Sequence, residues 1–240
     1  IKFHSVFWPA LLMAADIELP RRIYAHGFLL GADGRKMSKS DGNVLDPVAV
    51  VKEFSADALR FYLLRDVTFG ADGATSIDSV RARYESELAN DLGNLASRTI
   101  AMIVRYRDGN VPSSELDAGL RGDFEGLEER VAAHFAALEL SHALEEIWEL
   151  VRRLNRFVEE RAPWQLAKDE ADAAALDVVL ASLAEGLRVV AVLLHPYIPG
   201  SIDKLLGALH SPSVELSTAG FGAAIPARVE PLEPLFPKAR

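Results

Sequence analysis

The feature that most constrains this chain is a long stretch, after residue 76, in which apolar residues recur with the period of an α-helix. From Ile77 onward, apolar side chains recur three, four or seven positions apart, a spacing that places them on one face of an α-helix. The residues with this spacing are Tyr84, Leu88, Leu92, Leu95, Met102 and Tyr106. The spacing predicts an amphipathic helix of about 30 residues that ends at Asp108-Gly109 and must pack its apolar face against further helices.

Shorter helical patterns follow and supply that packing. The spacing predicts four of them, over residues 124–138, 141–161, 171–194 and 202–209. The second contains Trp148 within its apolar stripe, so we interpret this tryptophan as a core residue, and Ala162-Pro163-Trp164 ends that helix. Pro199-Gly200 is expected to act as a stop, and a Pro-, Gly- and Ala-rich stretch after residue 210 predicts an irregular tail. These patterns predict an up-and-down helical bundle.

The first 75 residues carry a different pattern. Residues 3–15 fit a buried helix interrupted near Pro9, and residues 23–30 form a short apolar run typical of a fully buried strand. A polar loop follows directly, which is the ordinary position of a ligand-binding loop in an open α/β sheet. Asp46-Pro47 then marks the first of two short helices, and turn residues at 68–73 mark a domain boundary.

Composition limits the chemistry of the chain. Of its 240 residues, 50% are hydrophobic and none is cysteine. Disulfides and thiolate zinc sites are therefore excluded, and we expect a cytoplasmic location and no metal site within this chain. No apolar run approaches the roughly 20 residues of a membrane span. The chain opens on Ile1 without an initiator methionine, and we expect it to be the second part of a longer protein.

The net charge of −9 argues against a surface coated for nucleic acid. Arginines nevertheless cluster in two helical stretches, at Arg81, Arg83, Arg98, Arg105 and Arg107, then at Arg152, Arg153, Arg156 and Arg161. They would suit a local RNA-binding strip, but charge alone favours ordinary solvated helix faces.

The polar loop from Gly34 to Asn43 concentrates cationic donors. Lys36 and Lys39 each carry three donors on a long stem, while serine hydroxyls and flanking glycines add further donors. Such a loop can grip a polyphosphate and stabilise charge on a departing pyrophosphate. It is not a Walker A motif, and its composition alone is more typical of a solvated surface turn.

The run Lys36-Met37-Ser38-Lys39-Ser40 resembles the Lys-Met-Ser-Lys-Ser signature of class I aminoacyl-tRNA synthetases. The resemblance implies that Lys36, Met37, Ser38, Lys39 and Ser40 bind the triphosphate of ATP, which enters with Mg²⁺ as a substrate. It also implies that Lys36 and Lys39 are the catalytic lysines, and Lys39 is the more directly engaged of the two.

Three further regions resemble the methionyl family. Residues 3–10 are similar to the segment that lines its methionine pocket, and the resemblance makes His4 and Trp8 the pocket pair. The two are four positions apart, on one face of a helix, where an aromatic ring could lie beside a polarizable thioether. From the residues alone, core side chains are the favoured interpretation of both.

Residues 90–98 resemble the anticodon-reading helix of the same family, with Asn94 and Arg98 as the reading pair. An amide beside a guanidinium can read the edge and phosphate of an unstacked base. The Arg161-Ala162-Pro163-Trp164 run resembles its stacking platform, because an indole held at a helix end can stack on a base. A polar helix face and a buried hydrophobic plug remain the alternatives.

The sequence thus predicts a mostly α protein: the end of a Rossmann-type α/β nucleotide-binding fold, a small stem-contact domain and a helical-bundle anticodon-binding domain. We expect the boundaries at residues 1–40, 41–75, 76–210 and 211–240, the last being the tail.

The resemblance implies ATP-dependent activation of methionine and its transfer to tRNA(Met). Partners would be tRNA(Met), ATP, methionine and the missing N-terminal half with its His-Ile-Gly-His signature. We expect a monomer that does not bind membranes and is inactive without that half. The alternatives are a non-catalytic tRNA-binding module and another class I synthetase for an aliphatic amino acid.

Overall fold

The computed structural model describes residues 2–38, 44–68 and 70–237. Its α-helices are α1 (Trp8–Ala14), α2 (Pro47–Glu53), α3 (Ala56–Asp66), α4 (Ile77–Arg83), α5 (Asn94–Arg107), α6 (Ala118–Phe124), α7 (Leu127–Ala137), α8 (Leu140–Arg161), α9 (Pro163–Leu166), α10 (Ala173–Leu194) and α11 (Pro199–Ala208). Segments η1 (Phe3–Phe7) and η2 (Tyr84–Gly93) are π-helical, while η3 (Glu170–Asp172) and η4 (Leu216–Thr218) are 3-10 turns. Strands β1 (Leu29–Leu30) and β2 (Gly73–Ala74) pair in parallel.

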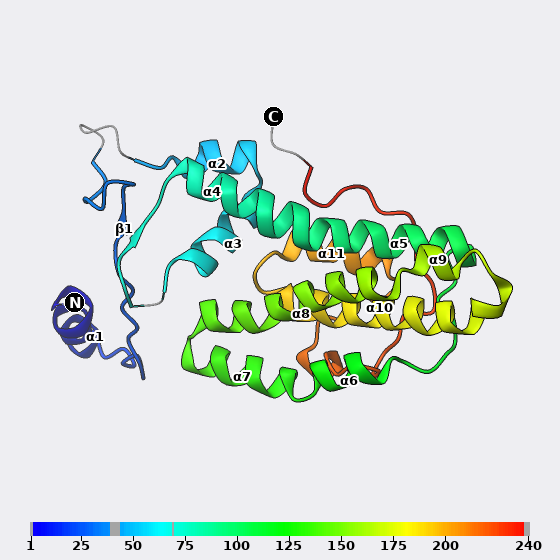
Figure 1. Ribbon diagram of the computed structural model, residues 1–240. Helices are drawn as coiled ribbons and strands as arrows, with labels where there is room; N and C mark the ends of the chain where they lie inside the picture. Colours follow the sequence, from blue (N-terminus) through cyan, green and yellow to red (C-terminus); the bar gives the residue numbers. More distant parts are fainter. Residues whose placement is uncertain (1, 39–43, 69, 238–240) are drawn as a thin grey trace.

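The molecule is elongated (Figure 1), with the N-terminal helix and the small sheet at one end and the helical bundle extending away from them. Helices α2 and α3 lie between these two parts. The predicted mostly α fold is therefore confirmed. No helix in the described ranges is long and apolar enough to cross a membrane.

The long predicted helix runs without interruption through α4, η2 and α5. It begins with a capping box, in which Ser76 and Ser79 exchange side-chain-to-backbone hydrogen bonds. It ends where Asp108 adopts a left-handed conformation, followed by Gly109 at positive φ. Both ends agree with the sequence pattern, because local cap chemistry decides where a helix starts and stops.

Helix α10 forms the centre of the bundle, and residues 179–194 are buried on every face. Helix α8 packs against it with the predicted apolar stripe, and Trp148 is fully buried there, as predicted, against Phe61 of α3. At Gly186 of α10 the Leu154 side chain of α8 packs directly onto the helix, and an added Cβ would meet a Leu154 methyl carbon at 2.6 Å. Each leucine or valine side chain buried in this way stabilises the folded state by about 1.5–3 kcal/mol relative to an exposed one.

The prediction of a buried strand over residues 23–30 is wrong. Only Leu29 and Leu30 form a strand, and Tyr24 and Phe28 are 53% and 66% exposed. The helix at residues 3–15 forms and continues past Pro9, but it too is exposed. An apolar run implies burial only where other elements cover it, and none of the described elements covers these residues.

Two helix boundaries also differ from the sequence pattern. The expected helix over 124–138 forms as α7 but starts three residues later, because Gly126 adopts positive φ just before it. Helix α6, capped by Asp117 and ending at Phe124, lies outside the predicted helices. Helix α11 begins at Pro199 rather than after it, because proline is favourable in the first helical turn.

The tail from residue 211 is largely irregular, as predicted, and it is tied to the bundle. Arg188 and Glu185 form a buried ion pair on α10. Arg188 donates to the carbonyls of Thr218 and Gly220, and Glu185 accepts from the Gly222 amide. The buried charges of Arg188 and Glu185 neutralise each other, and their further hydrogen bonds hold the irregular tail in place.

Replacing Gly186 by alanine should test the close approach of α8 and α10. The new methyl group would overlap the Leu154 side chain, so we expect a loss of about 1–3 kcal/mol in the free energy of unfolding. Gly207→Ala on α11 is the matched control, because nothing lies within 4 Å of its added Cβ. Alanine there should be neutral or stabilising by up to about 1 kcal/mol. Equal denaturant midpoints for the two variants would contradict the packing argument.

Candidate functional site

The described part of the cationic loop is held in a tight turn. The Gly31 amide donates to the Arg35 carbonyl at 2.8 Å, Gly34 adopts positive φ, and Leu30 and Lys36 form an antiparallel bridge. Lys36 is exposed, while Met37 and Ser38 are half-buried. Lys39 and Ser40, the other two predicted loop residues, lie outside the described residues.

The small parallel sheet positions the start of this loop. The Thr75 amide and hydroxyl both donate to the Leu30 carbonyl, at 2.9 and 3.1 Å. Asp72 accepts from the Phe28 amide at 2.7 Å. Sequence analysis missed Asp72, because the partner of this carboxylate is 44 residues away along the chain.

The predicted pocket pair, His4 and Trp8, does come together on the N-terminal helix. The two rings lie 6.5 Å apart in an edge-to-face arrangement. With Phe3, Phe7 and Leu11 they line an open hollow, and Trp8 is 43% exposed. The described loop residues do not line this hollow. The arrangement presents an aromatic surface that could take up a small apolar group.

At the opposite end of the bundle, Arg98 and Trp164 meet. The guanidinium of Arg98 lies over the indole at 5.7 Å and also pairs with Glu159 at 2.7 Å. Trp164 is half-buried at the start of α9, where Ala162 adopts a left-handed conformation and Pro163 is buried. The predicted partner Asn94 is exposed one turn before Arg98, on the same face.

A pocket of about 220 Å³ adjoins this pair and contains residues that sequence analysis did not assign to it. Besides Arg98 and Trp164, it is lined by Ala101, Met102, Arg105 and Tyr106. Met102 and Tyr106 follow the same periodicity as the core, but they lie at its edge and are half-buried. The signal that could have identified them is their position, one and two turns beyond Arg98.

Most arginines of the two basic clusters are neutralised by carboxylates. Ion pairs join Arg81 to Glu53, Arg107 to Asp177, Arg153 to Asp123 and Arg161 to Asp117. Among the described residues, Arg105 has no ion pair and lies over the Tyr106 ring. Few arginines of the two clusters are therefore available to an anionic ligand. One of these, Arg105, borders the Trp164 pocket.

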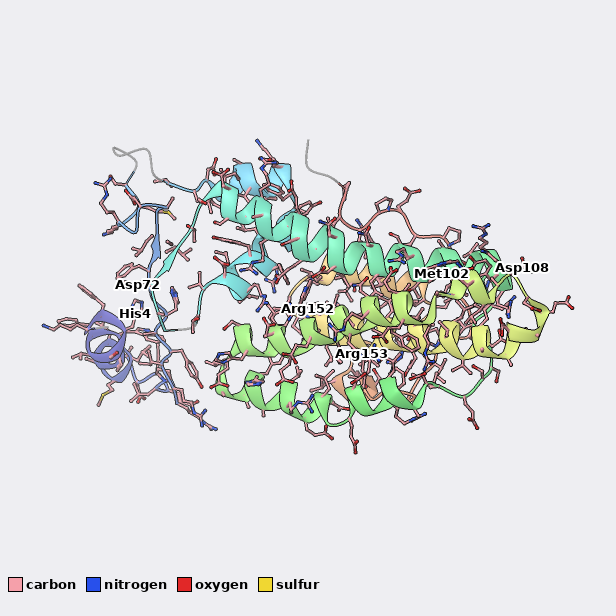
Figure 2. The ribbon with its side chains drawn as sticks, in the orientation of Figure 1. His4, Asp72, Met102, Asp108, Arg152 and Arg153 are labelled. Atoms are coloured by element: carbon pink, nitrogen blue, oxygen red, sulfur yellow. The ribbon has the colours of Figure 1, made fainter. Side chains whose placement is uncertain are left out.

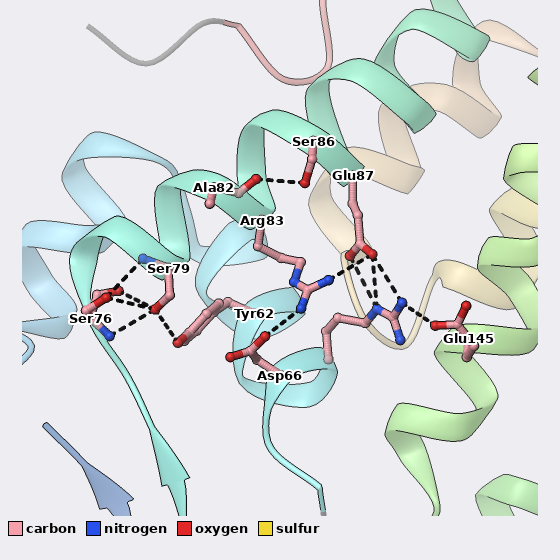
Figure 3. A network of polar contacts seen from close by, with 10 residues as sticks. Tyr62, Asp66, Ser76, Ser79, Ala82, Arg83, Ser86, Glu87 and Glu145 are labelled. Atoms are coloured by element: carbon pink, nitrogen blue, oxygen red, sulfur yellow. Dashed lines mark hydrogen bonds and ion pairs between the residues drawn. The ribbon is translucent and has the colours of Figure 1, made fainter. Parts of the chain in front are cut away.

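A polar network joins α3 to the bundle between these two ends (Figure 3). Glu87 of η2 is buried and accepts from Arg65 of α3 at 3.1 Å and from Arg83 at 3.0 Å. Arg65 also pairs with Glu145 of α8, which pairs with Arg152. Burial tends to raise the pKa of Glu145, but the hydrogen bonds from Arg65 and Arg152 outweigh it and lower the pKa below its usual value.

The two candidate regions are far apart. His4 lies at one end of the molecule, and Met102 and Asp108 lie towards the other (Figure 2). A single small ligand cannot contact both regions, so the arrangement requires either two ligands or one large, elongated ligand.

Comparisons with known families cover most of the chain. Residues 1–100 match the family described as tRNA synthetases class I (M). Residues 110–225 match the family described as the anticodon binding domain of methionyl tRNA ligase.

Individual relatives give the same result. The methionine–tRNA ligase of Caldanaerobacter subterraneus subsp. tengcongensis is 44% identical over 213 residues, which are 87% of this chain and 33% of the relative. That of Bacillus subtilis is 42% identical over 247 residues, 99% of this chain and 37% of the relative. The structure of Mycobacterium tuberculosis methionyl-tRNA synthetase in complex with methionyl-adenylate matches with a TM-score of 0.88 at 41% identity, covering 98% of this chain and 48% of that chain.

The fold and the matched families define part of a class I aminoacyl-tRNA synthetase. Within this class, the chain belongs to the methionyl-tRNA synthetase family. It spans between 33% and 48% of the length of the relatives described above.

Glu87→Gln should test whether the polar network stabilises the junction. The substitution removes a charge that two arginines share in a buried position, so we expect a loss of about 1–3 kcal/mol in the free energy of unfolding. Glu159→Gln removes an exposed partner of Arg98 and should cost less than about 0.5 kcal/mol. Chemical denaturation of both variants is the measurement, and a Glu87 variant as stable as the Glu159 variant would refute the expectation.

Proposed function

We propose that this chain supplies the ATP-phosphate loop and the anticodon-reading surface of a methionine–tRNA ligase. The complete reaction activates methionine with ATP and transfers it to tRNA(Met). The single observation that carries the proposal is the meeting of Arg98 and Trp164 beside the pocket, in a family member that also retains the Lys36–Ser40 signature.

The loop would act on the phosphates of ATP. Lys36 and Lys39 would place positive charge against the triphosphate and stabilise the charge that develops on the leaving pyrophosphate. Met37, Ser38 and Ser40 complete the predicted ATP-binding set, and Mg²⁺ would enter with the nucleotide. The pairing of β1 with β2 supports this role, because it fixes the strand from which the loop departs.

The methionine pocket would include His4 and Trp8. Their edge-to-face contact and their open hollow support a role in holding an apolar, polarizable side chain. The exposure of Phe3, Phe7 and Phe28 supports the further proposal that a complete amino-acid site needs additional protein surface, supplied by the N-terminal half of the enzyme.

The anticodon would bind at the far end of the bundle. The exposed Asn94 amide can exchange hydrogen bonds with a base edge, and the partly exposed indole of Trp164 can stack on a splayed base. Arg98 lies over the indole and one turn from Asn94, and it can add charge to either interaction. The separation of the two regions supports a large ligand, since tRNA could bridge a catalytic end and an anticodon end.

The remaining assignments follow from this proposal. Residues 1–40 would complete the catalytic domain, 41–75 would contact the tRNA stem, 76–210 would read the anticodon, and 211–240 would pack back across the domains. We propose a monomer that works in the cytoplasm with tRNA(Met), ATP and methionine.

Trp164→Ala should weaken binding of an anticodon stem-loop RNA bearing CAU. Loss of one stacked base should cost about 1–3 kcal/mol, measured by titration of the RNA with the protein. Trp8→Ala is the matched control, because this indole is also accessible to solvent but lies in the N-terminal helix, away from the bundle. It should leave the affinity for the stem-loop unchanged.

Circular dichroism should show both tryptophan variants folded. If Trp164→Ala lowers affinity equally for the CAU stem-loop and for one with an unrelated anticodon, the tryptophan is a general contact. If it leaves both affinities unchanged, the anticodon assignment is wrong.

The chain alone should not support methionine-dependent exchange of pyrophosphate into ATP. The aromatic hollow is open on one side, and the described loop does not close over it. A radioactive exchange assay with the purified chain is the measurement, and exchange above the methionine-free background would contradict the prediction.

A further inference from the structure

Two histidines and a glutamate gather at the turn between α7 and α8. The Nδ1 atom of His134 lies 2.8 Å from Oε2 of Glu139, and the Nδ1 atom of His142 lies 4.0 Å from the same oxygen. One ligand atom from each of the three side chains falls within 4.8 Å of the others. The two imidazole rings are 5.9 Å apart.

The backbone brings these residues together across the turn. Leu138 adopts a left-handed conformation and ends α7, and the Glu139 amide then donates to the His134 carbonyl at 2.9 Å. Glu139 is the residue immediately before α8, and His142 follows it by three residues, so their side chains lie near each other.

The turn is also anchored to the core of the bundle. The buried Tyr197 hydroxyl donates to the Leu140 carbonyl at 2.8 Å, and the Tyr197 ring packs against Phe135. Both contacts involve neighbours of the three side chains, so the site is held in place without the participation of any ligand. Such pre-organisation lowers the entropic cost of binding.

We propose that His134, Glu139 and His142 bind one divalent transition-metal ion, with zinc as the natural occupant. Imidazole and carboxylate groups suit borderline ions such as zinc, whereas calcium and magnesium prefer sites built from oxygen alone. Three protein ligands leave a position for water, as in open zinc sites. The ion would link the end of α7 to the start of α8.

The distances fit such an ion after small side-chain rotations. Zinc bonds to nitrogen and oxygen of about 2.0–2.2 Å place ligand atoms about 3.3–3.5 Å apart in a tetrahedral site. The separations of 2.8 and 4.0 Å lie on either side of this value. Glu139 and His142 are 49% and 62% exposed and can turn towards the ion without disturbing the core.

This proposal revises the expectation that the chain has no metal site. That expectation rested on the lack of cysteine, and a spacing of five and then three residues across the turn between two helices is not a familiar ligand pattern. The site comes from the geometry at Leu138, which the sequence pattern does not reveal.

Isothermal titration of the metal-stripped chain with zinc chloride near neutral pH tests the proposal. We expect one equivalent to bind, and His142→Ala to weaken binding by at least about tenfold. His142 is the most exposed of the three side chains, so its loss should leave the fold intact. Cobalt should give visible absorption bands in the unmodified chain that are absent in the variant.

His195→Ala and His210→Ala are the matched controls, because each of these histidines also pairs with a single carboxylate, at 3.1 and 3.0 Å. Both should bind zinc as the unmodified chain does. Undiminished binding in His142→Ala, no saturable binding, or binding only with self-association in size-exclusion chromatography would each overturn the proposal. The cluster would then be an ordinary pair of histidine–carboxylate contacts.

Discussion

The burial of α10 is the constraint on which the rest of the structure depends. Its last four turns are covered on all sides, so neighbouring helices must approach from every direction. At Gly186, Leu154 of α8 occupies the space that a side chain on α10 would need. Because α8 ends at the turn that carries Trp164, the packing of two apolar helices also places the indole against α5.

Buried polar contacts join the remaining segments of the chain to this apolar framework. Glu185 and Arg188 lie inside the bundle and order the tail, while Glu87 links α3 to the long helix. Buried ions are costly unless each is paired and hydrogen-bonded, and these groups have several partners. They sit where regular backbone hydrogen bonding cannot join the segments, and so they determine how the parts of the molecule are oriented.

The success of sequence-based prediction varied with what each residue contacts. Helix positions in the bundle could be predicted, because burial of one face imposes the period of 3.6 on the sequence. The apolar run at residues 23–30 has the composition of a strand, but strand formation needs neighbours, and β2 pairs with only two of its residues. The division between α6 and α7 rests on the backbone conformation of Gly126, which composition does not specify.

The same reasoning applies to the candidate sites. Asn94 and Arg98 could be placed on one face from their spacing, and the resemblance singled out Trp164. The contact between Arg98 and Trp164 depends on the tertiary fold, because the indole belongs to a helix more than 60 residues further along the chain. Met102 and Tyr106 could not be separated from the core by periodicity, since a residue at the edge of an apolar face obeys the same period as one at its centre.

Charge pairing limits how this acidic chain could bind RNA in its proposed role. The net charge is −9, and most arginines in the basic clusters are engaged by neighbouring carboxylates. Long-range attraction to a polyanion is therefore weak, and affinity must come from short-range contacts. The Trp164 pocket offers such contacts, because it combines an aromatic face with Arg98 and Arg105. A surface of this kind favours discrimination between unstacked bases over indiscriminate binding of phosphates, since stacking and edge recognition require the base itself.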